Sequence, residues 1–275
     1  MTKVSVIIPT FNRQEYIQRA IKSVLAQTYK DFEIIVVNDG STDNTVEILK
    51  LYLPKIKLIN IENSGVSFAR NLGVKNSNGD LIAFLDSDDE WLPQKLEKQM
   101  KFHENNLSIP LIHGEELWVR NGKRVNPKNK HKKSGGFIIE KCLPMCVISP
   151  SATIINRDIY NEFCGFREDY PACEDYDLWL KVCSKYEIGF IEEPIIIKYG
   201  GHSDQLSAKF IGMDYWRINS LIDLLEYSKI DILRSTIIKL INKKLHILEI
   251  GSIKHDNQKM LKNIKTLKMR LTNYK

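Results

Sequence analysis

The chain of 275 residues lacks a hydrophobic run that could cross a membrane, because no stretch approaches about 18 consecutive apolar residues. It also lacks any CxxC pair, and its cysteines are odd in number, at five. That pattern predicts free thiols in a reducing cytoplasm rather than a disulfide framework. The first three residues lead directly into an apolar run, so we expect no signal peptide and a cytoplasmic protein.

The composition is that of an ordinary globular protein, with 43% hydrophobic and 27% charged residues. The net charge of +6 is unevenly distributed along the chain. Residues 229–275 hold twelve Lys or Arg and three Asp or Glu, a net charge of +9, so the other 228 residues sum to −3. This asymmetry indicates an anionic partner for the C-terminal segment rather than for the whole protein.

Short apolar runs alternate with helical patterns through the first 105 residues. One apolar stripe has the spacing of a core-facing helix: Ile17, Ala20, Ile21, Val24 and Leu25. A later helix, through Phe68, Ala69 and Leu72, is expected to end at Gly73, since glycine commonly closes helices. Strands that alternate with helices predict an α/β fold with a mostly parallel sheet and right-handed crossovers.

Two acidic segments each follow an apolar run that reads as a buried strand. Residues 38–43 (NDGSTD) follow the run 32–37, and residues 86–89 (DSDD) follow the run 81–85. Open α/β sheets bind ligands beyond the carboxyl ends of their strands. Crowded carboxylates repel one another unless a cation or a donor compensates them. The two segments therefore predict a site for a divalent metal and for a group that the metal neutralises, such as a diphosphate.

The pattern is less regular after residue 105. Asn121-Gly122 between apolar residues predicts a β-hairpin. Residues 123–133 contain six Lys or Arg and no acid, which predicts a solvated loop or, alternatively, a contact with an anionic acceptor. Residues 188–191 and 195–197 are predicted as two short strands separated by Pro194.

From about residue 207 the chain has helical periodicity with many lysines. Three interpretations remain open for these basic helices. They could pack on the preceding domain with lysines outward, lie on an anionic membrane surface, or form a dimerisation arm.

Four segments together resemble the family 2 glycosyltransferases of the GT-A fold: residues 5–13 (SVIIPTFNR), 38–45 (NDGSTDNT), 69–73 (ARNLG) and 86–89 (DSDD). The segments occur in the family's order and cover roughly residues 3–205. The resemblance implies a GT-A domain over 1–205, with a nucleotide-binding half at 1–105 and an acceptor half at 106–205, followed by a basic helical extension at 206–275.

The resemblance implies roles for residues on the donor side. Asp39 would accept a hydrogen bond from the ring N–H of a uracil or thymine base. Pro9, Thr10 and Asn12 would line the same nucleotide pocket. Arg70 would pair with the diphosphate or with Asp39.

Residues 86–88 (DSD) resemble the family's DxD element. Alternate residues of an extended segment point the same way, so Asp86 and Asp88 can face one site. Hard carboxylate oxygens suit Mn²⁺ or Mg²⁺. We expect Asp88 to bind the metal directly and Asp86 to contact ribose, sugar or a metal-bound water. His202 follows the last strand, where the family often places a metal-binding histidine, and Asp89 either joins the site or caps a helix starting near residue 91.

Residues 174–180 (EDYDLWL) resemble the family's Glu-Asp motif before its acceptor helix. Inverting transfer needs one general base to take the proton of the attacking acceptor hydroxyl. We assign this role to Asp175, with Glu174 beside it in the substrate site. Any of the four tryptophans could stack on a sugar ring, and the sequence does not choose among them.

These features predict a metal-dependent, inverting glycosyltransferase that uses a nucleotide-sugar, in particular a UDP-sugar. Its acceptor would be a glycan or lipid-linked molecule of cell-surface polysaccharide synthesis, with peripheral membrane contact through the C-terminal helices. Two rivals are a nucleotidyltransferase and a non-catalytic nucleotide-sugar-binding scaffold. The absence of glycine from residues 9–13 counts against the first, and the acidic residues kept at 86, 88 and 175 count against the second. No nucleic-acid-binding module is recognisable, and the sequence does not indicate an oligomeric state.

Overall fold

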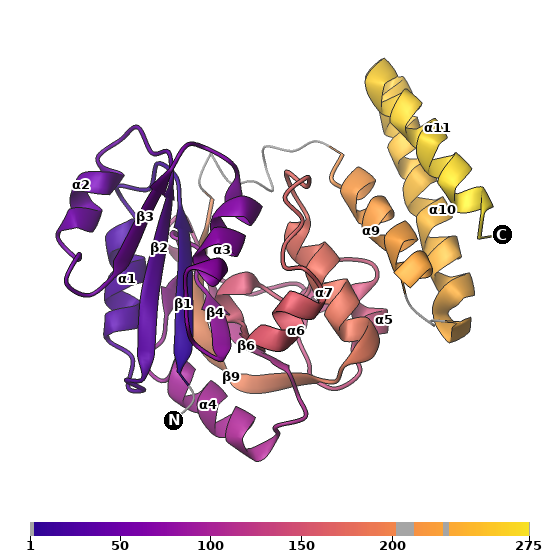
Figure 1. Cartoon of the computed structure of the whole chain (residues 1–275). Helices are drawn as coiled ribbons and strands as arrows, with labels where there is room; N and C mark the ends of the chain where they lie inside the picture. Colours follow the sequence, from indigo (N-terminus) through magenta and orange to yellow (C-terminus); the bar gives the residue numbers. More distant parts are fainter. Residues whose placement is uncertain (1–2, 202–211, 228–230, 275) are drawn as a thin grey trace.

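The computed structural model describes residues 3–201, 212–227 and 231–274. One mixed sheet of nine strands runs through the molecule, with helices packed against it and three further helices at the C-terminal end (Figure 1). The strand order is β3-β2-β1-β4-β8-β6-β9-β5, and β7 pairs with β6. The predicted α/β class is confirmed.

The first half of the sheet is parallel, as the alternation of strands and helices predicts. Strand β1 pairs in parallel with β2 and with β4, and β2 pairs in parallel with β3. The elements of this half are β1 (Val4–Thr10), α1 (Ile17–Leu25), β2 (Phe32–Asp39), α2 (Thr45–Lys50), β3 (Lys57–Ile61), α3 (Val66–Lys75), β4 (Leu81–Phe84), β5 (Glu90–Trp91) and α4 (Lys95–Asn105). Every residue of β1 is buried, because helices cover both faces of the sheet here.

Helix α3 continues past Gly73 to Lys75, so the prediction that Gly73 ends this helix is wrong. A Cβ atom added at Gly73 would lie 2.5 Å from Cγ2 of Ile7 on β1. The glycine therefore permits close packing of α3 on the sheet. Asn76 occupies the C-cap position instead.

The second half joins the sheet through antiparallel pairs. Its elements are β6 (Leu111–Arg120), β7 (Lys123–Val125), η1 (Asn129–His131), α5 (Ile139–Cys142), η2 (Pro150–Ala152), β8 (Ile154–Asn156), α6 (Arg157–Glu162), α7 (Glu174–Lys185) and β9 (Ile188–Gly200). Strand β8 is antiparallel to both β4 and β6, whereas β6 and β9 are parallel. The β6–β7 hairpin is confirmed: Asn121 and Gly122 both have positive φ angles, of 48° and 74°.

Strand β9 is continuous, so the prediction of two short strands split by Pro194 is wrong. The pairing of β6 with β9 shifts register around Glu115, where Gly114 pairs with Ile191 and Glu115 pairs with Pro194. This irregularity accommodates the additional residues of β9 and its proline, which has no N–H to donate to the neighbouring strand.

The C-terminal segment is helical, as expected. Helix α9 (Asp214–Tyr227) packs against α7, and α10 (Asp231–Lys254) and α11 (Gln258–Thr272) form an antiparallel pair on α9 (Figure 1). The buried faces carry Ile218, Ile241 and Ile264, which belong to the same apolar cluster as α7. Within 3–201, 212–227 and 231–274, no helix combines the length and the apolar character of a membrane span.

Candidate functional site

The predicted site residues of the first half lie where parallel strands end. Thr10 ends β1 and is in register with Asn38, next to Asp39 at the end of β2. Asp86 follows β4, which is in register with β1 from Leu81 to Phe84. The two acidic segments therefore lie at the carboxyl edge of the sheet, where α/β proteins bind ligands.

Asp39 is almost fully buried, at 4% exposure, and its carboxylate holds the loop after β3. Oδ1 accepts the backbone N–H of Ser64 at 2.6 Å, and Oδ2 accepts that of Gly65 at 2.9 Å. Gly65 directly precedes α3, so Asp39 fixes the start of the helix that carries Arg70. Each carboxylate oxygen has a second lone pair, which keeps Asp39 able to accept a further donor.

Hydrogen bonds join the loop after β1 to the loop after β2. Oδ1 of Asn12 accepts the backbone N–H of Thr42 at 2.8 Å, and the Asn12 N–H donates to Oγ of Ser41 at 2.9 Å. Asn12 has a φ of 51°, a left-handed conformation that asparagine tolerates. Pro9 and Thr10 are buried at the strand end, and Oγ1 of Thr10 has no hydrogen-bond partner among the residues described. An unpaired buried hydroxyl marks a place where a ligand could supply the missing partner.

Arg70 links the two halves of the site. Its guanidinium is 3% exposed and donates to Oδ1 of Asp86 at 2.6 Å and to Oε1 of Glu174 at 2.7 Å. The ring of Phe166 lies 4.9 Å below it. Arg70 therefore pairs with these two carboxylates instead of with Asp39, and its partner Glu174 lies 104 positions away in sequence.

The acidic segment after β4 has an uneven electrostatic balance. Burial raises the pKa of Asp86, but the charge and hydrogen bond of Arg70 outweigh it, so that pKa is lowered. The pKa of Asp88 is raised, by burial first and then by the charge of Asp86. Burial also raises the pKa of Asp89 well above its usual value, against the opposing charge of Lys198. The carboxyl groups crowd here beyond what the protein's own cations compensate.

Asp89 does not cap a helix, so the expectation of a cap for a helix starting near residue 91 is wrong. It is 2% exposed, with Oδ2 accepting the Ser151 hydroxyl at 2.7 Å and Oδ1 accepting the Tyr199 amide at 3.1 Å. The next helix, α4, begins at Lys95, because the short strand β5 intervenes. Asp89 thus ties the acidic segment to β9.

Asp86 and Asp88 fit a divalent cation in their chemistry. Carboxylate oxygens are the ligands that Mg²⁺ and Mn²⁺ prefer. Burial, and then the charge of Asp86, raises the pKa of Asp88, and a bound cation would oppose both effects. In the part of the chain that the structure describes, no three His, Cys, Asp or Glu side chains are grouped to hold a metal. His202, the other predicted metal ligand, lies outside the described residues. The remaining ligands would have to come from substrate phosphate and water, as is usual for Mg²⁺ sites.

Glu174 and Asp175 occupy the first turn of α7. Burial and the charge of Asp175 raise the pKa of Glu174, although Arg70 opposes both. Asp175 is half-buried, and its Oδ1 accepts the backbone N–H of Tyr176 at 2.7 Å. Its Oδ2 lies 3.5 Å from the thiol sulfur of Cys146. Asp177, in the same turn, is buried and pairs instead with Lys181.

Sequence reasoning did not single out Lys198, and it assigned Lys133 to a solvated loop or to contact with an anionic acceptor, whereas both lysines lie beside acidic side chains. Lys198, on β9, donates to Oγ of Ser149 at 2.9 Å, and the charges of Glu116 and Asp89 raise its pKa despite burial. Lys133 lies 2.9 Å from the buried Glu116 carboxylate. The sequence did hold a signal for Lys198, which directly follows the apolar run 195–197. A lysine next to such a run is expected to need an acidic partner, because an unpaired charge is rarely buried.

Asp175 opens onto a cavity of about 300 Å³. Glu116, Trp118, Cys146 and Lys198 also line it, so β6, β9 and the segment before β8 form its walls. The cavity places the predicted base beside polar and aromatic side chains of the second half.

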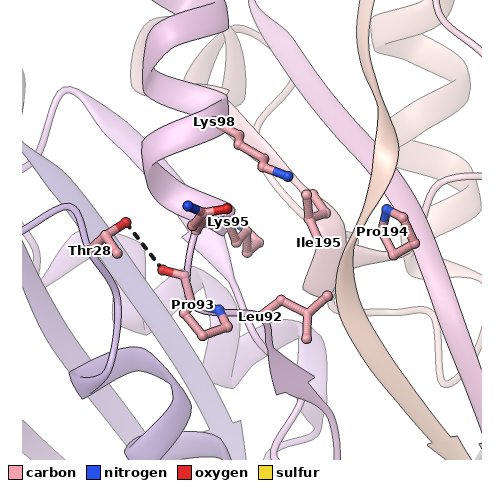
Figure 2. A pocket seen from close by; sticks show the side chains of 8 residues that line it. Thr28, Leu92, Pro93, Lys95, Lys98, Pro194 and Ile195 are labelled. Atoms are coloured by element: carbon pink, nitrogen blue, oxygen red, sulfur yellow. Dashed lines mark hydrogen bonds between the residues drawn. The ribbon is translucent and has the colours of Figure 1, made fainter.

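A larger cavity, of about 390 Å³, lies at the start of α4 (Figure 2). Thr28 donates to the Pro93 carbonyl at its edge, and Lys98 pairs with Glu193. The Lys95 ammonium donates to Gln99 at 2.7 Å. None of the predicted site residues lines this cavity, so we assign it no part in the chemistry.

Residues 5–163 match the family described as Glycosyl transferase family 2. WfgD of Escherichia coli, named as a UDP-Glc:alpha-D-GlcNAc-diphosphoundecaprenol beta-1,3-glucosyltransferase, is 35% identical over 196 residues, or 68% of this chain and 72% of WfgD. A glycosyltransferase of Rickettsia conorii is 37% identical over 202 residues, or 70% of this chain and 32% of its own length. The chain spans about a third of the length of the first curated relatives that it matches.

Solved structures show the same fold. TarS of S. aureus in complex with UDP-GlcNAc has a TM-score of 0.73 at 22% identity, covering 88% of this chain and 71% of that chain. The mannosyltransferase PcManGT of Pyrobaculum calidifontis, solved with GDP-Man and Mn²⁺, has a TM-score of 0.61 at 15% identity, covering 99% and 86%. At these identities the likeness concerns the fold, and it confirms the expected GT-A type.

Proposed function

Because the chain belongs to glycosyl transferase family 2, we propose that it transfers a sugar from a nucleotide-sugar to a hydroxyl group of an acceptor. The proposed donor is a UDP-sugar. The proposed acceptor is a glycan, a glycolipid or a related molecule of cell-surface polysaccharide synthesis. The observation that carries the proposal is the buried Asp86–Arg70–Glu174 connection, which couples the acidic segment after β4 to the helix of Asp175.

The donor would bind across the ends of β1 and β2. Asp39 is proposed to accept the ring N–H of the uracil base, while Pro9, Thr10 and Asn12 line the nucleotide pocket. The unpaired hydroxyl of Thr10 supports this placement, because a bound nucleotide could supply its partner. Arg70 is proposed to place one positive charge near the diphosphate while it holds Asp86 in position.

Metal dependence is part of the proposal. Asp88 would bind Mn²⁺ or Mg²⁺, with Asp86 and His202 as further candidates. When bound, the metal would neutralise the charge that develops on the leaving nucleoside diphosphate. The crowded carboxylates after β4 support this assignment, because a cation would stabilise the charged forms of Asp88 and Asp89, whose pKa values burial raises.

Asp175 is proposed as the general base of an inverting transfer. It would take the proton of the acceptor hydroxyl as that oxygen attacks the anomeric carbon opposite the leaving diphosphate, so no covalent enzyme intermediate forms. The half-buried carboxylate lines the cavity of about 300 Å³, which gives an acceptor room to approach. Glu174 is paired with Arg70 and is less free to act as a base.

We also propose that the chain meets a membrane surface through its basic C-terminal helices while it serves a lipid-linked acceptor. The acceptor named for the similar enzyme WfgD is attached to diphosphoundecaprenol. The net charge of +9 over residues 229–275 supports contact with anionic lipids.

Calorimetric titration with UDP, dTDP, GDP and CDP, each with and without Mn²⁺, tests the proposed function. We expect UDP to bind most tightly and its affinity to collapse without the metal. Preference for another base would move the donor and keep the reaction class. Absence of metal-dependent binding for all four nucleotides would contradict the proposal and favour a scaffold role.

A further inference from the structure

The four tryptophans, among which the sequence does not choose, differ in burial and in surroundings in the structure. Trp91 and Trp179 are buried in the core, at 2% and 1% exposure. Trp216 packs against the rings of Tyr170 and Tyr215, with centroids 4.9 Å away in both cases. Trp118, on β6, is half-buried and lines the same cavity as Asp175. Among the described residues, Trp118 is thus the tryptophan that shares a cavity with the proposed base.

Buried polar contacts hold the indole of Trp118 in one orientation. Its Nε1–H donates to Oε2 of Glu116 at 2.8 Å. Glu116 is 4% exposed, and its other oxygen lies 2.9 Å from Nζ of Lys133. Lys133 in turn donates to the Val147 carbonyl at 2.7 Å. An aromatic ring fixed in this way can receive a flat ligand face without losing further conformational freedom.

The surroundings of Trp118 are basic. The guanidinium of Arg120 lies 5.8 Å from its ring centroid, and the ring of His131 lies 5.3 Å away. Arg120, His131 and Lys133 line the cavity. Exposed basic side chains continue along the β6–β7 hairpin and the loop that follows it, at Lys123, Arg124, Lys128 and Lys132. Residues 121–135 contain no Asp or Glu.

We propose that Trp118 is the platform on which the sugar ring of the acceptor stacks, and that this acceptor carries a phosphate group beside the ring. The apolar face of a pyranose would cover the indole, while one of its hydroxyl groups reaches Asp175 in the same cavity. The phosphate would lie toward Arg120 and the basic hairpin. This inference rests on the proposed function and adds a binding residue and a substrate class to it.

The test uses the whole protein loaded with UDP and Mg²⁺, a diamagnetic ion that leaves nearby signals sharp, and the NMR signals of the tryptophan indole N–H groups. The probes are methyl glycosides and glycosyl phosphates of glucose, galactose, mannose and N-acetylglucosamine. The signal missing in Trp118→Phe identifies Trp118. We expect at least one glycosyl phosphate to shift that signal and to bind about tenfold more tightly than the matching methyl glycoside.

Substitutions separate stacking from folding. Trp118→Ala should weaken binding of that glycosyl phosphate about tenfold, whereas Trp118→Phe keeps a ring and should stay near wild type. Trp216→Phe, outside the cavity, is the matched control and should leave the affinity unchanged. Arg120→Gln with Lys123→Gln should abolish the preference for the phosphate over the methyl glycoside.

If the protein binds UDP but no probe shifts the Trp118 signal, this inference is overturned and the proposed function still stands. Wild-type affinity in Trp118→Ala would do the same. Equal affinity for the two probe classes would remove the phosphate from the proposal. Failure to bind UDP in the same samples would instead overturn the proposed function, and this inference with it.

Discussion

At Asp175, one carboxylate oxygen accepts a backbone N–H and the other faces the thiol of Cys146. These contacts orient the carboxylate that we propose as the base, and Lys198 lines the same cavity. Asp175→Asn keeps the shape and removes the basic oxygen. We expect transfer to fall by about 10²–10⁴, the usual contribution of a general base, while UDP binding is retained. Initial rates of UDP release with acceptor, beside calorimetric UDP affinity, measure the two effects.

Glu187→Gln is the matched control for this substitution. Glu187 is an exposed carboxylate just beyond the C-terminal end of α7, and its loss should leave transfer at wild-type rates. If Asp175→Asn turns over as fast as Glu187→Gln, the base must be assigned to another residue.

His113 predicts a pH dependence of stability. Burial, and then the charge of Lys133, lowers its pKa to about 3, and its Nε2–H donates to the Ser134 carbonyl at 3.0 Å. Below about pH 6.5 the unfolded chain binds a proton at this histidine that the folded chain rejects. The free energy of unfolding therefore falls as pH drops from 6.5 toward 3, by up to about 1.4 kcal/mol per pH unit from this group.

Urea unfolding of the wild type and of His113→Gln, at several pH values between 7.5 and 4.5, measures this contribution. The variant is expected to lose less stability over the range, whatever its stability at pH 7.5. His103 also has a lowered pKa but is present in both proteins, so it cancels in the difference. Parallel curves for the two proteins would show that His113 takes up its proton in the folded state.

Single residues at strand ends could be predicted from the sequence because their place follows from the chain itself. Asp39 and Asp86 come directly after apolar runs, and parallel strands bring such positions to one edge. The partner of Arg70 could not be predicted, since Glu174 lies 104 positions away. Nor could the choice of Trp118, which depends on which indole the folded core leaves beside a cavity.

At the scale of elements, two helical glycines predict opposite effects of one substitution. In Gly73→Ala on α3, the new methyl group would meet Ile7 at 2.5 Å and Val37 at 3.3 Å. We expect a loss of about 1–3 kcal/mol of stability, because a packed core resists an added methyl group. In Gly251→Ala on α10, the added carbon would meet no atom within 4 Å among the described residues, apart from its own helix backbone. A gain of about 0.5–1 kcal/mol should follow from helix propensity alone.

Thermal and urea unfolding of both variants compare the two glycines directly. Donor binding should remain in Gly251→Ala, because α10 is remote from the sheet edge that holds the proposed nucleotide site (Figure 1). Stabilisation of both variants would mean that α3 moves away from β1 at little cost.

Helix α3 and strand β9 show how far local patterns predict elements. The apolar spacing of α3 predicted the helix, but a rule for helix ends misread Gly73, whose role depends on β1 across the contact. Pro194 misled in a similar way, because the break it predicts in β9 is absorbed by a register shift with β6. Local rules fix where elements form, whereas tertiary contacts decide where they end.

Across the whole molecule, the C-terminal helices combine packing with an unusual outer face. Their inner faces join the core, which agrees with helices packed on the domain. The exposed face of α10 mixes isoleucines with basic side chains: Ile232, Lys239, Lys243, His246, Ile247, Ile250, Ile253 and Lys254. Glu249, the acid in that stretch, is half-buried and pairs with Lys268 of α11. Apolar residues among lysines on one helix face are typical of helices that lie on anionic membranes.

The proposed membrane contact can be placed on the part of α10 that leads to α11. In the view of Figure 1, the turn between α10 and α11 rises on the same side as the carboxyl ends of the parallel strands. Ile247, Ile250 and Ile253 lie near that turn and are 54%, 53% and 64% exposed.

Replacing these three isoleucines by serine tests the membrane contact, because exposed positions can change with little effect on folding. The wild type should sediment with vesicles of phosphatidylcholine and phosphatidylglycerol, and far less with phosphatidylcholine alone or in high salt. The triple variant should bind the anionic vesicles at least about tenfold more weakly, since each buried isoleucine contributes on the order of 1 kcal/mol.

A matched triple variant carries the same change elsewhere: Leu51, Leu53 and Leu107, each at least half exposed, become serine. It should sediment like the wild type, because these positions lie in the sheet domain. Equal sedimentation of the two triple variants would rule out the α10 face as the membrane contact. If the isoleucine variant instead turns a dimer into a monomer in size-exclusion chromatography, that face joins two copies of the chain, and the basic helices are the dimerisation arm.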